Sequence, residues 1–138
     1  MDLAVSTRYV LARAQLEAIR LGQEICPEHI LLGILKMSEL TAADIARGSR
    51  REAETDNDIA ALRKIFADLD VNTAAARKAL RQALRDAPPY GDGTSKTLRL
   101  QTRVEEMAMG RAVFPCDLLS ALTAQPSPVL RTILNISP

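Results

Sequence analysis

The chain has 138 residues, of which 47% are hydrophobic but only 3% aromatic and none tryptophan, so it suits one domain with an aliphatic core, which favours packed helices over a sheet sandwich. Its formal net charge of +1 argues against binding of nucleic acid or an anionic membrane through bulk positive charge. No apolar run approaches the roughly 18 residues that a membrane span needs, and the first residues do not form a signal peptide, so we expect a cytoplasmic protein with no membrane or nucleic-acid partner.

The first predicted helix covers residues 4 to 21, where apolar residues recur at steps of three and four. The residues expected to face the core are Val5, Ala12, Leu16 and Ile19, flanked by Val10, Ala14 and Leu21. Arg13 and Glu17 fall on the other face, four positions apart, so we expect them to form a weak surface ion pair.

Residues 21 to 35 hold the clearest helix-stop and helix-start signals in the sequence. Gly22 suits the left-handed conformation that closes a helix, and Pro27 suits the first turn of the next one. A second, short helix is therefore predicted at residues 27 to 36. Its apolar residues leave almost no polar face, so it should be buried nearly all round: Ile30, Leu31, Leu32, Ile34 and Leu35.

The next stretch, residues 38 to 57, is polar and charged, and we predict an exposed insertion with one short helix at 41 to 46. A third core helix follows, with inward residues Ile59, Leu62, Phe66 and Leu69. The fourth helix is predicted at residues 74 to 85, because Asn72 or Thr73 can accept the free N–H groups of its first turn.

Two prolines and two glycines make residues 86 to 94 a linker. A helix at 95 to 109, a short buried helix at 115 to 122 and a last helix that starts near Ser127 and Pro128 follow it. The side chains expected to point inward from the first and last of these are Leu100, Val104, Met107, Val129, Leu130, Ile133 and Leu134.

The short buried helix and the glycine before it occur twice, 88 residues apart. The matching pairs are Gly22 and Gly110, Pro27 and Pro115, and Leu31 and Leu119. We therefore predict an internal duplication, with repeat one at residues 1 to 85 and repeat two at residues 95 to 138.

The better copy begins at Leu21 and Gly22 and continues at residues 28 to 35 as Glu-His-Ile-Leu-Leu-Gly-Ile-Leu. It resembles the signature of the Clp N-terminal repeat domain, which opens the ClpA and ClpC unfoldases. The resemblance covers both repeats and leaves out residues 38 to 57. It implies one compact all-α domain over residues 1 to 138, with two pseudo-symmetric helical repeats and about seven to eight helices.

In that family the domain is not catalytic. It captures substrates or adaptor proteins for a ring-shaped AAA+ ATPase, which unfolds proteins for a peptidase. The resemblance therefore implies a protein-binding domain that works with a Clp-type ATPase, in cis or in trans, and that is a monomer in isolation. The alternative is a free-standing regulatory interaction module of the same fold that is not attached to an unfoldase.

Few side chains suit a metal, a cofactor or a reaction. One histidine and the isolated Cys26 and Cys116 fall short of the roughly four ligands of a zinc site. No Gly-x-x-x-x-Gly-Lys-Ser/Thr loop occurs, so we expect no ATPase, cofactor or catalytic residue. Cys116 follows a helix start that can lower a thiol pKa, but we favour a partly buried, inert thiol.

Glu28 and His29 are the polar residues of the signature. In some family members the matching glutamate binds phosphoarginine with a threonine near the start of the first helix of a repeat. Here, the threonine positions hold Ala4 and Asp92, and the second glutamate position holds Cys116. Glu28 remains a candidate binding residue, although its place in a helix's first turn is also stabilising by itself. His29 is expected to be a hydrogen-bonded structural residue rather than a base or metal ligand.

Two further surfaces are candidates for binding. Arg77, Arg81 and Arg85 lie four apart on the fourth helix and form either a solvated face or a docking edge for an acidic adaptor or substrate. Phe114, in the second inter-helix loop, and Tyr90, in the linker, are candidates to line a hydrophobic groove for an unfolded segment or an adaptor tail. Ile25 and Val113 occupy the same two loops, where packing beneath the loop explains them equally well.

Overall fold

The protein is described by a computed structural model that covers residues 3 to 89 and 92 to 136. Over these residues the fold is all-helical, as the composition predicts, with eight helices and no strand. The helices are α1 (Val5–Leu21), α2 (Pro27–Ser38), α3 (Ala42–Ala46), α4 (Glu52–Asp68), α5 (Thr73–Asp86), α6 (Gly93–Ala108), α7 (Pro115–Ala124) and α8 (Pro128–Ile133). None of the described helices is long and apolar enough to cross a membrane.

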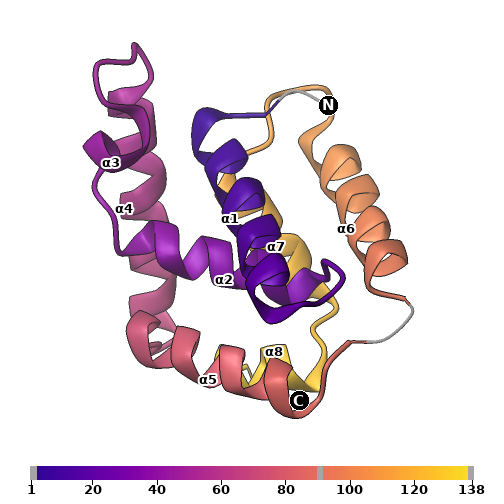
Figure 1. Ribbon diagram of the computed structural model, residues 1–138. Helices are drawn as coiled ribbons and strands as arrows, with labels where there is room; N and C mark the ends of the chain where they lie inside the picture. The colour runs from indigo at the N-terminus through magenta and orange to yellow at the C-terminus, as the bar shows by residue number, and fades with distance from the viewer. Residues whose placement is uncertain (1–2, 90–91, 137–138) are drawn as a thin grey trace.

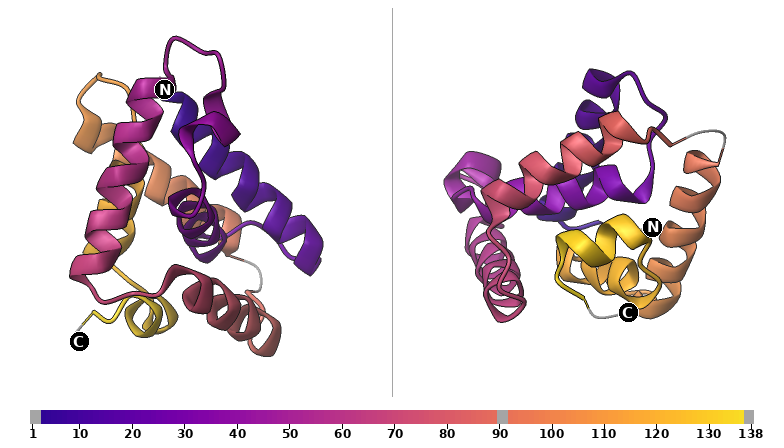
Figure 2. Two further views of the ribbon diagram at one scale, coloured as in Figure 1. Left: turned by 90° about the vertical axis from the view of Figure 1, so that its left-hand side faces the viewer. Right: turned by 90° about the horizontal axis from the view of Figure 1, so that it is seen from below.

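Helix α2 lies at the centre of the fold. It packs against α1, α4, α5, α6 and α7, while α3 and α4 lie on one side of the molecule and α6 on the other (Figure 1). The left view of Figure 2 looks nearly along α2, with other helices around it. Its apolar side chains are fully buried, which confirms the predicted burial on all sides: Ile30, Leu31, Leu32, Ile34, Leu35 and Met37.

The connection into α2 has the predicted backbone geometry. Gly22 is left-handed, with φ of 66°, and the N–H of Gln23 reaches back to the carbonyl of Ala18 at 2.9 Å, which closes α1. Pro27 occupies the first turn of α2. These signals are local to the chain, so they can be read correctly without knowing the tertiary contacts.

The face of α1 that meets the core differs from the predicted one. Leu16 and Ile19 are 37% and 65% exposed, and Ala12 is exposed as well. The reason is the close approach of α2, where a Cβ at Gly33 would lie 2.5 Å from the carbonyl oxygen of Val10. At that distance only small side chains fit between the helices. The buried residues of α1 are therefore mostly small, with Glu17 as the exception: Ser6, Thr7, Val10, Ala14, Glu17 and Ala18.

The predicted position of Glu17 on the outer face of α1 is also wrong. Its side chain lies on the inner side of α1 and is only 2% exposed. Besides the predicted pair with Arg13, it binds Arg81 of α5. The sequence around α1 carries no signal of this partner, which is 64 positions away.

The predicted insertion is only partly an exposed segment. The short helix α3 forms as expected after Thr41, but α4 begins at Glu52, well inside the polar stretch. Ala42, Ala46 and Thr55 are buried where α3 packs on α4. Residues 47 to 51 form the exposed loop between these two helices, at the upper left of Figure 1.

The remaining helices follow the predictions closely. Asn72 accepts a hydrogen bond from the N–H of Ala75 at 3.0 Å, and Ser127 accepts one from Leu130 at 3.3 Å, so both predicted caps form. Helix α6 starts two residues earlier than expected and leaves Met107 42% exposed, because Ala108 takes the last inner position. Most of the core residues predicted for α4, α6 and α8 are buried: Ile59, Leu62, Phe66, Leu100, Val104, Leu130 and, directly after α8, Leu134. Apart from Met107, the other three are half-buried: Leu69, Val129 and Ile133.

Candidate functional site

His29 fixes the loop before α2, as the sequence predicts. Its Nδ1 accepts a hydrogen bond from the backbone N–H of Cys26 at 2.9 Å, so Nε2 carries the proton and donates to the side-chain oxygen of Gln23 at 3.0 Å. Asp117 makes the corresponding contact before α7, where its carboxylate accepts a hydrogen bond from the backbone N–H of Phe114 at 2.8 Å. Burial lowers the pKa of His29, which keeps it neutral. Both ring nitrogens are used within the loop, so His29 is a structural residue.

Two buried threonines tie each half of the fold to the loop of the other half. The Thr7 hydroxyl, on α1, donates to the carbonyl of Val113 at 2.6 Å. Thr97, on α6, has its hydroxyl oxygen 2.9 Å from the carbonyl of Gly93 and 3.4 Å from that of Ile25. Ile25 and Val113 hold matching places in the two inter-helix loops, so the contact is made in both directions.

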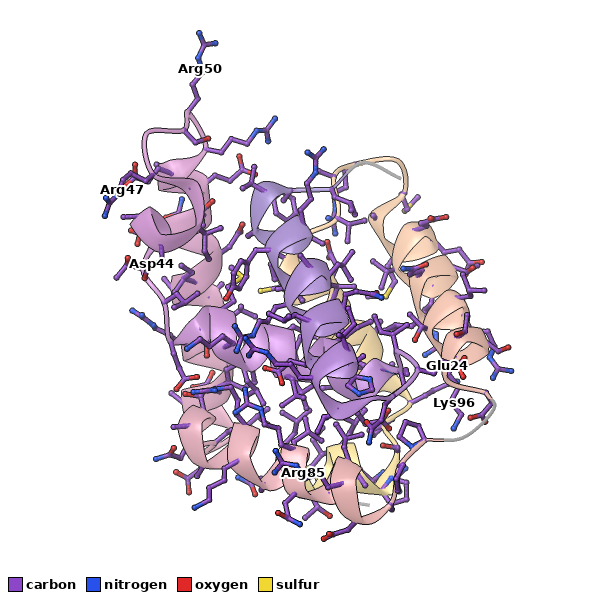
Figure 3. The ribbon with its side chains drawn as sticks, in the orientation of Figure 1. Glu24, Asp44, Arg47, Arg50, Arg85 and Lys96 are labelled. Atoms are coloured by element: carbon purple, nitrogen blue, oxygen red, sulfur yellow. The ribbon has the colours of Figure 1, made fainter. Side chains whose placement is uncertain are left out.

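The predicted basic row on α5 is largely occupied by internal partners. Arg81 binds both carboxylate oxygens of Glu17, at 3.1 and 2.7 Å, and Arg77 binds both oxygens of Glu39, beyond the end of α2. Arg85 is exposed and points outward from α5 (Figure 3). The row therefore attaches α5 to α1 and α2, and of the three predicted docking residues only Arg85 is left to solvent.

The carboxylate of Glu17 is the buried centre of this attachment. Burial raises its pKa, but the hydrogen bonds and positive charges of Arg81 and Arg13 outweigh that effect and hold the pKa below its ordinary value. Glu17 is thus ionised near neutral pH although its side chain is almost inaccessible to water. An ionised carboxylate at such a site depends on its arginine partners.

The two cysteines are free thiols. The Sγ of Cys26 lies 3.2 Å from Nδ1 of His29, but Cys26 is buried and only 1% exposed. Burial raises the pKa of Cys26 to about 12. Burial and the nearby carboxylates of Asp58 and Asp117 also raise the pKa of Cys116, which agrees with the preferred interpretation of an inert thiol at this helix start. In the part of the chain that the structure describes, no group of three or more His, Cys, Asp or Glu side chains could hold a metal ion.

The predicted apolar loop surface is mostly packed away. Val113 is buried and Ile25 half-buried, so both pack beneath their loops. Phe114 is half-buried before α7, with the guanidinium of Arg111 5.9 Å from the ring centre. Tyr90 lies outside the described residues.

A groove of about 520 Å³ opens instead between α6, the turn from α7 to α8 and the start of α2. One wall is the face of α6 that carries Lys96, Arg99 and Arg103. Glu28 borders the groove from α2, and the Ser127 hydroxyl donates to its carboxylate at 3.0 Å. The apolar residues that line the groove are Pro27, Leu100, Ala121, Leu122, Pro126, Pro128 and Leu130. We call this site the α6 groove.

Among the predicted binding residues that the structure describes, only Glu28 borders the α6 groove. The basic wall was not predicted, although its signal is present in the sequence, because positions 96, 99 and 103 are spaced for one face of a helix. The apolar lining comes from α6, α7 and α8 together. Only the tertiary fold brings these segments to one place.

No protein-family profile matches the chain. The comparisons with curated proteins and with solved structures also give no significant match. The comparisons therefore add no support to the resemblance to the Clp N-terminal repeat domain, which is a resemblance of sequence residues.

Proposed function

We propose that the chain is a protein-binding domain of the Clp N-terminal type, which recruits substrates or adaptor proteins to a Clp-type ATP-dependent unfoldase. The observation that carries the proposal is the reciprocal contact between the halves. Thr7 meets the loop carbonyl of Val113, and Thr97 lies near that of Ile25. In a pseudo-twofold duplication each such contact is expected twice, with the partners exchanged.

The inner faces of α1 and α6 support the same relation. Their buried residues pair at a constant separation of 90: Thr7 with Thr97, Val10 with Leu100, Ala14 with Val104 and Ala18 with Ala108. The inter-helix loops and the short buried helices match at a separation of 88 residues instead. The second half is therefore two residues shorter than the first between its long helix and its inter-helix loop. The shortening falls at the end of α6, where Met109 and Gly110 both have positive φ. When the separation of the long helices is applied to Ala4, the matching position is Thr94 rather than Asp92.

A binding role fits the chemistry of the described residues better than catalysis does. His29 is buried with both ring nitrogens occupied, and burial raises the pKa of both thiols, Cys26 and Cys116. A nucleophile needs an adjacent base or a lowered pKa, and it must be accessible to a substrate. Cys26 has Nδ1 of His29 at 3.2 Å from its Sγ, but its pKa is raised and the residue is only 1% exposed. Cys116 also has a raised pKa, and within the described residues no base is hydrogen-bonded to it. The α6 groove, by contrast, combines apolar lining with a few charged groups, which is the usual composition of a binding site.

The test is affinity capture with the immobilised chain, followed by identification of the retained proteins. A Clp-type ATPase or one of its adaptors should be enriched over an unrelated helical domain of similar size and charge. The identified protein, once purified, should then form a complex with the chain in analytical ultracentrifugation. Recovery of defined partners without any Clp component would instead favour a free-standing regulatory module.

A further inference from the structure

We propose that the α6 groove binds a short, extended peptide segment that combines acidic residues with an adjacent aliphatic residue. The inference deepens the proposed function by naming the chemistry of the captured segment, and its biological meaning rests on that function. The binding itself does not, since it is a property of the groove. The observations that carry it are the charge of the α6 wall, the apolar lining and the placement of Glu28.

The wall of the groove carries positive charge that the rest of the fold leaves largely uncompensated. Within the described residues no carboxylate forms an ion pair with Arg99 or Arg103. Arg103 donates instead to the neutral side-chain oxygen of Gln125. Lys96 pairs with Asp92 at 3.2 Å, but both side chains are exposed, so an incoming carboxylate can replace this weak pair.

The three cations are also arranged for an extended ligand. Lys96, Arg99 and Arg103 follow one face of α6 from position 96 to position 103, a helix rise of about 10 Å. An extended peptide covers that length with about three residues. Because side chains alternate between the two sides of an extended peptide, two carboxylates at alternate positions can face the wall together. Arginine is well suited to bind each of them with two hydrogen bonds.

The lining explains why the ligand is expected to be amphipathic. Leu100, Leu122 and Leu130 line the groove from three different helices. The volume of about 520 Å³ lies within the usual range of binding pockets, roughly 300 to 1,000 Å³. An aliphatic side chain placed there adds apolar contact that a purely acidic segment lacks.

Glu28 restricts the orientation of the ligand. Its carboxylate is held by the Ser127 hydroxyl at the α2 border of the groove, where it repels acidic groups. The acidic residues must therefore lie along α6, away from Glu28, and a peptide N–H or a hydroxyl group suits the Glu28 side. A nucleic-acid strand fits less well, because a uniform row of phosphates meets this carboxylate and the described lining offers no aromatic ring for stacking.

The test is fluorescence anisotropy with the fluorescein-labelled peptide Gly-Ser-Leu-Glu-Leu-Asp-Glu-Ser-Gly and the purified chain. We expect saturable binding that weakens as salt rises, and that weakens at least about tenfold in the double variant Arg99→Glu with Arg103→Glu. The matched control is Arg47→Glu with Arg50→Glu, which changes the net charge equally on the loop between α3 and α4, far from α6 (Figure 3). This control should bind within about twofold of the wild type. Thermal unfolding of both variants confirms that they are folded.

Two comparison probes keep the result specific. One probe has lysine in place of the acidic residues, and the other has serine in place of leucine. Both should bind more weakly than the acidic, leucine-containing peptide. The proposal would be overturned if either comparison peptide bound as tightly as the acidic, leucine-containing peptide, or if both double variants lost peptide affinity equally. It would also be overturned if a single-stranded oligonucleotide bound more tightly than that peptide in a way that depends on Arg99. Capture of a Clp component without peptide binding would support the proposed function and contradict the peptide site. Peptide binding without capture of a Clp component would support the peptide site and contradict the proposed function.

Discussion

Helices α5 and α6 each carry three basic residues on one face, but their surroundings differ. On α5, Arg77 and Arg81 are bound by carboxylates from α1 and from the residue that follows α2. On α6, Arg99 and Arg103 border a groove and have no ion pair within the described residues. The comparison shows that a basic row becomes a structural attachment or stays without ion-pair partners according to which acidic residues the fold places opposite it.

The largest expected effect is the loss of the α5 attachment. Arg81→Ala leaves the buried carboxylate of Glu17 with Arg13 alone, and we expect the free energy of unfolding to fall by about 2–3 kcal/mol. Urea unfolding followed by circular dichroism measures this. Arg85→Ala, on the same helix but exposed, is the matched control and should change stability by less than about 0.5 kcal/mol. Equal effects of the two substitutions would contradict the assigned difference within the row.

The pH dependence of stability should show whether the carboxylate of Glu17 is ionised in the folded protein. The folded-state pKa of Glu17 lies below its ordinary value of 4.5, so its ion pairs stabilise the fold fully above about pH 4.5 and lose that effect as the pH falls through the folded pKa. Glu17→Gln should therefore destabilise the protein by about 2 kcal/mol at pH 7. This difference should shrink between pH 5 and pH 3. A difference that stays constant over this range would show that Glu17 is not ionised in the folded protein.

The second α5 arginine should matter less. Arg77 and Glu39 are both partly accessible to solvent, so Arg77→Ala should cost only about 1 kcal/mol in urea unfolding. The double variant with Glu39→Ala should be nearly as stable as the single variant, because the pair is lost in both. Strict additivity of the two single changes would mean that the two side chains do not interact in solution.

The smallest expected effect on stability is at α6. Replacing Arg99 and Arg103 with glutamate removes no ion pair within the described residues, so the free energy of unfolding should change by less than about 0.5 kcal/mol. Thermal unfolding with the loop variant Arg47→Glu and Arg50→Glu as the control measures this. A loss comparable to that of Arg81→Ala would place the α6 row among the structural attachments.

Local signals account for the parts of the fold that the sequence predicts well. Gly22, Pro27, Asn72 and Ser127 define helix ends through their own backbone or side chain, and the uninterrupted apolar run of α2 admits only a buried position. None of these depends on a distant partner.

Contacts between distant segments account for the parts that were predicted wrongly. The periodicity of α1 allows two inner faces, and the close approach at Gly33 selects the face with small residues, which leaves Ile19 exposed and brings Glu17 inside. The arginines of α5 and α6 look alike as sequence patterns. Only the positions of Glu17 and Glu39 in the fold distinguish them.

The most direct test of the account is the mapping of backbone amide chemical shifts by NMR during a titration with the acidic, leucine-containing peptide. We predict shift changes that cluster at Lys96, Arg99 and Arg103 and at Glu28 across the groove, with Arg77 and Arg81 unaffected. Shift changes centred on α5, or none at the α6 groove at saturating peptide, would contradict the assignment of binding to α6 and of attachment to α5.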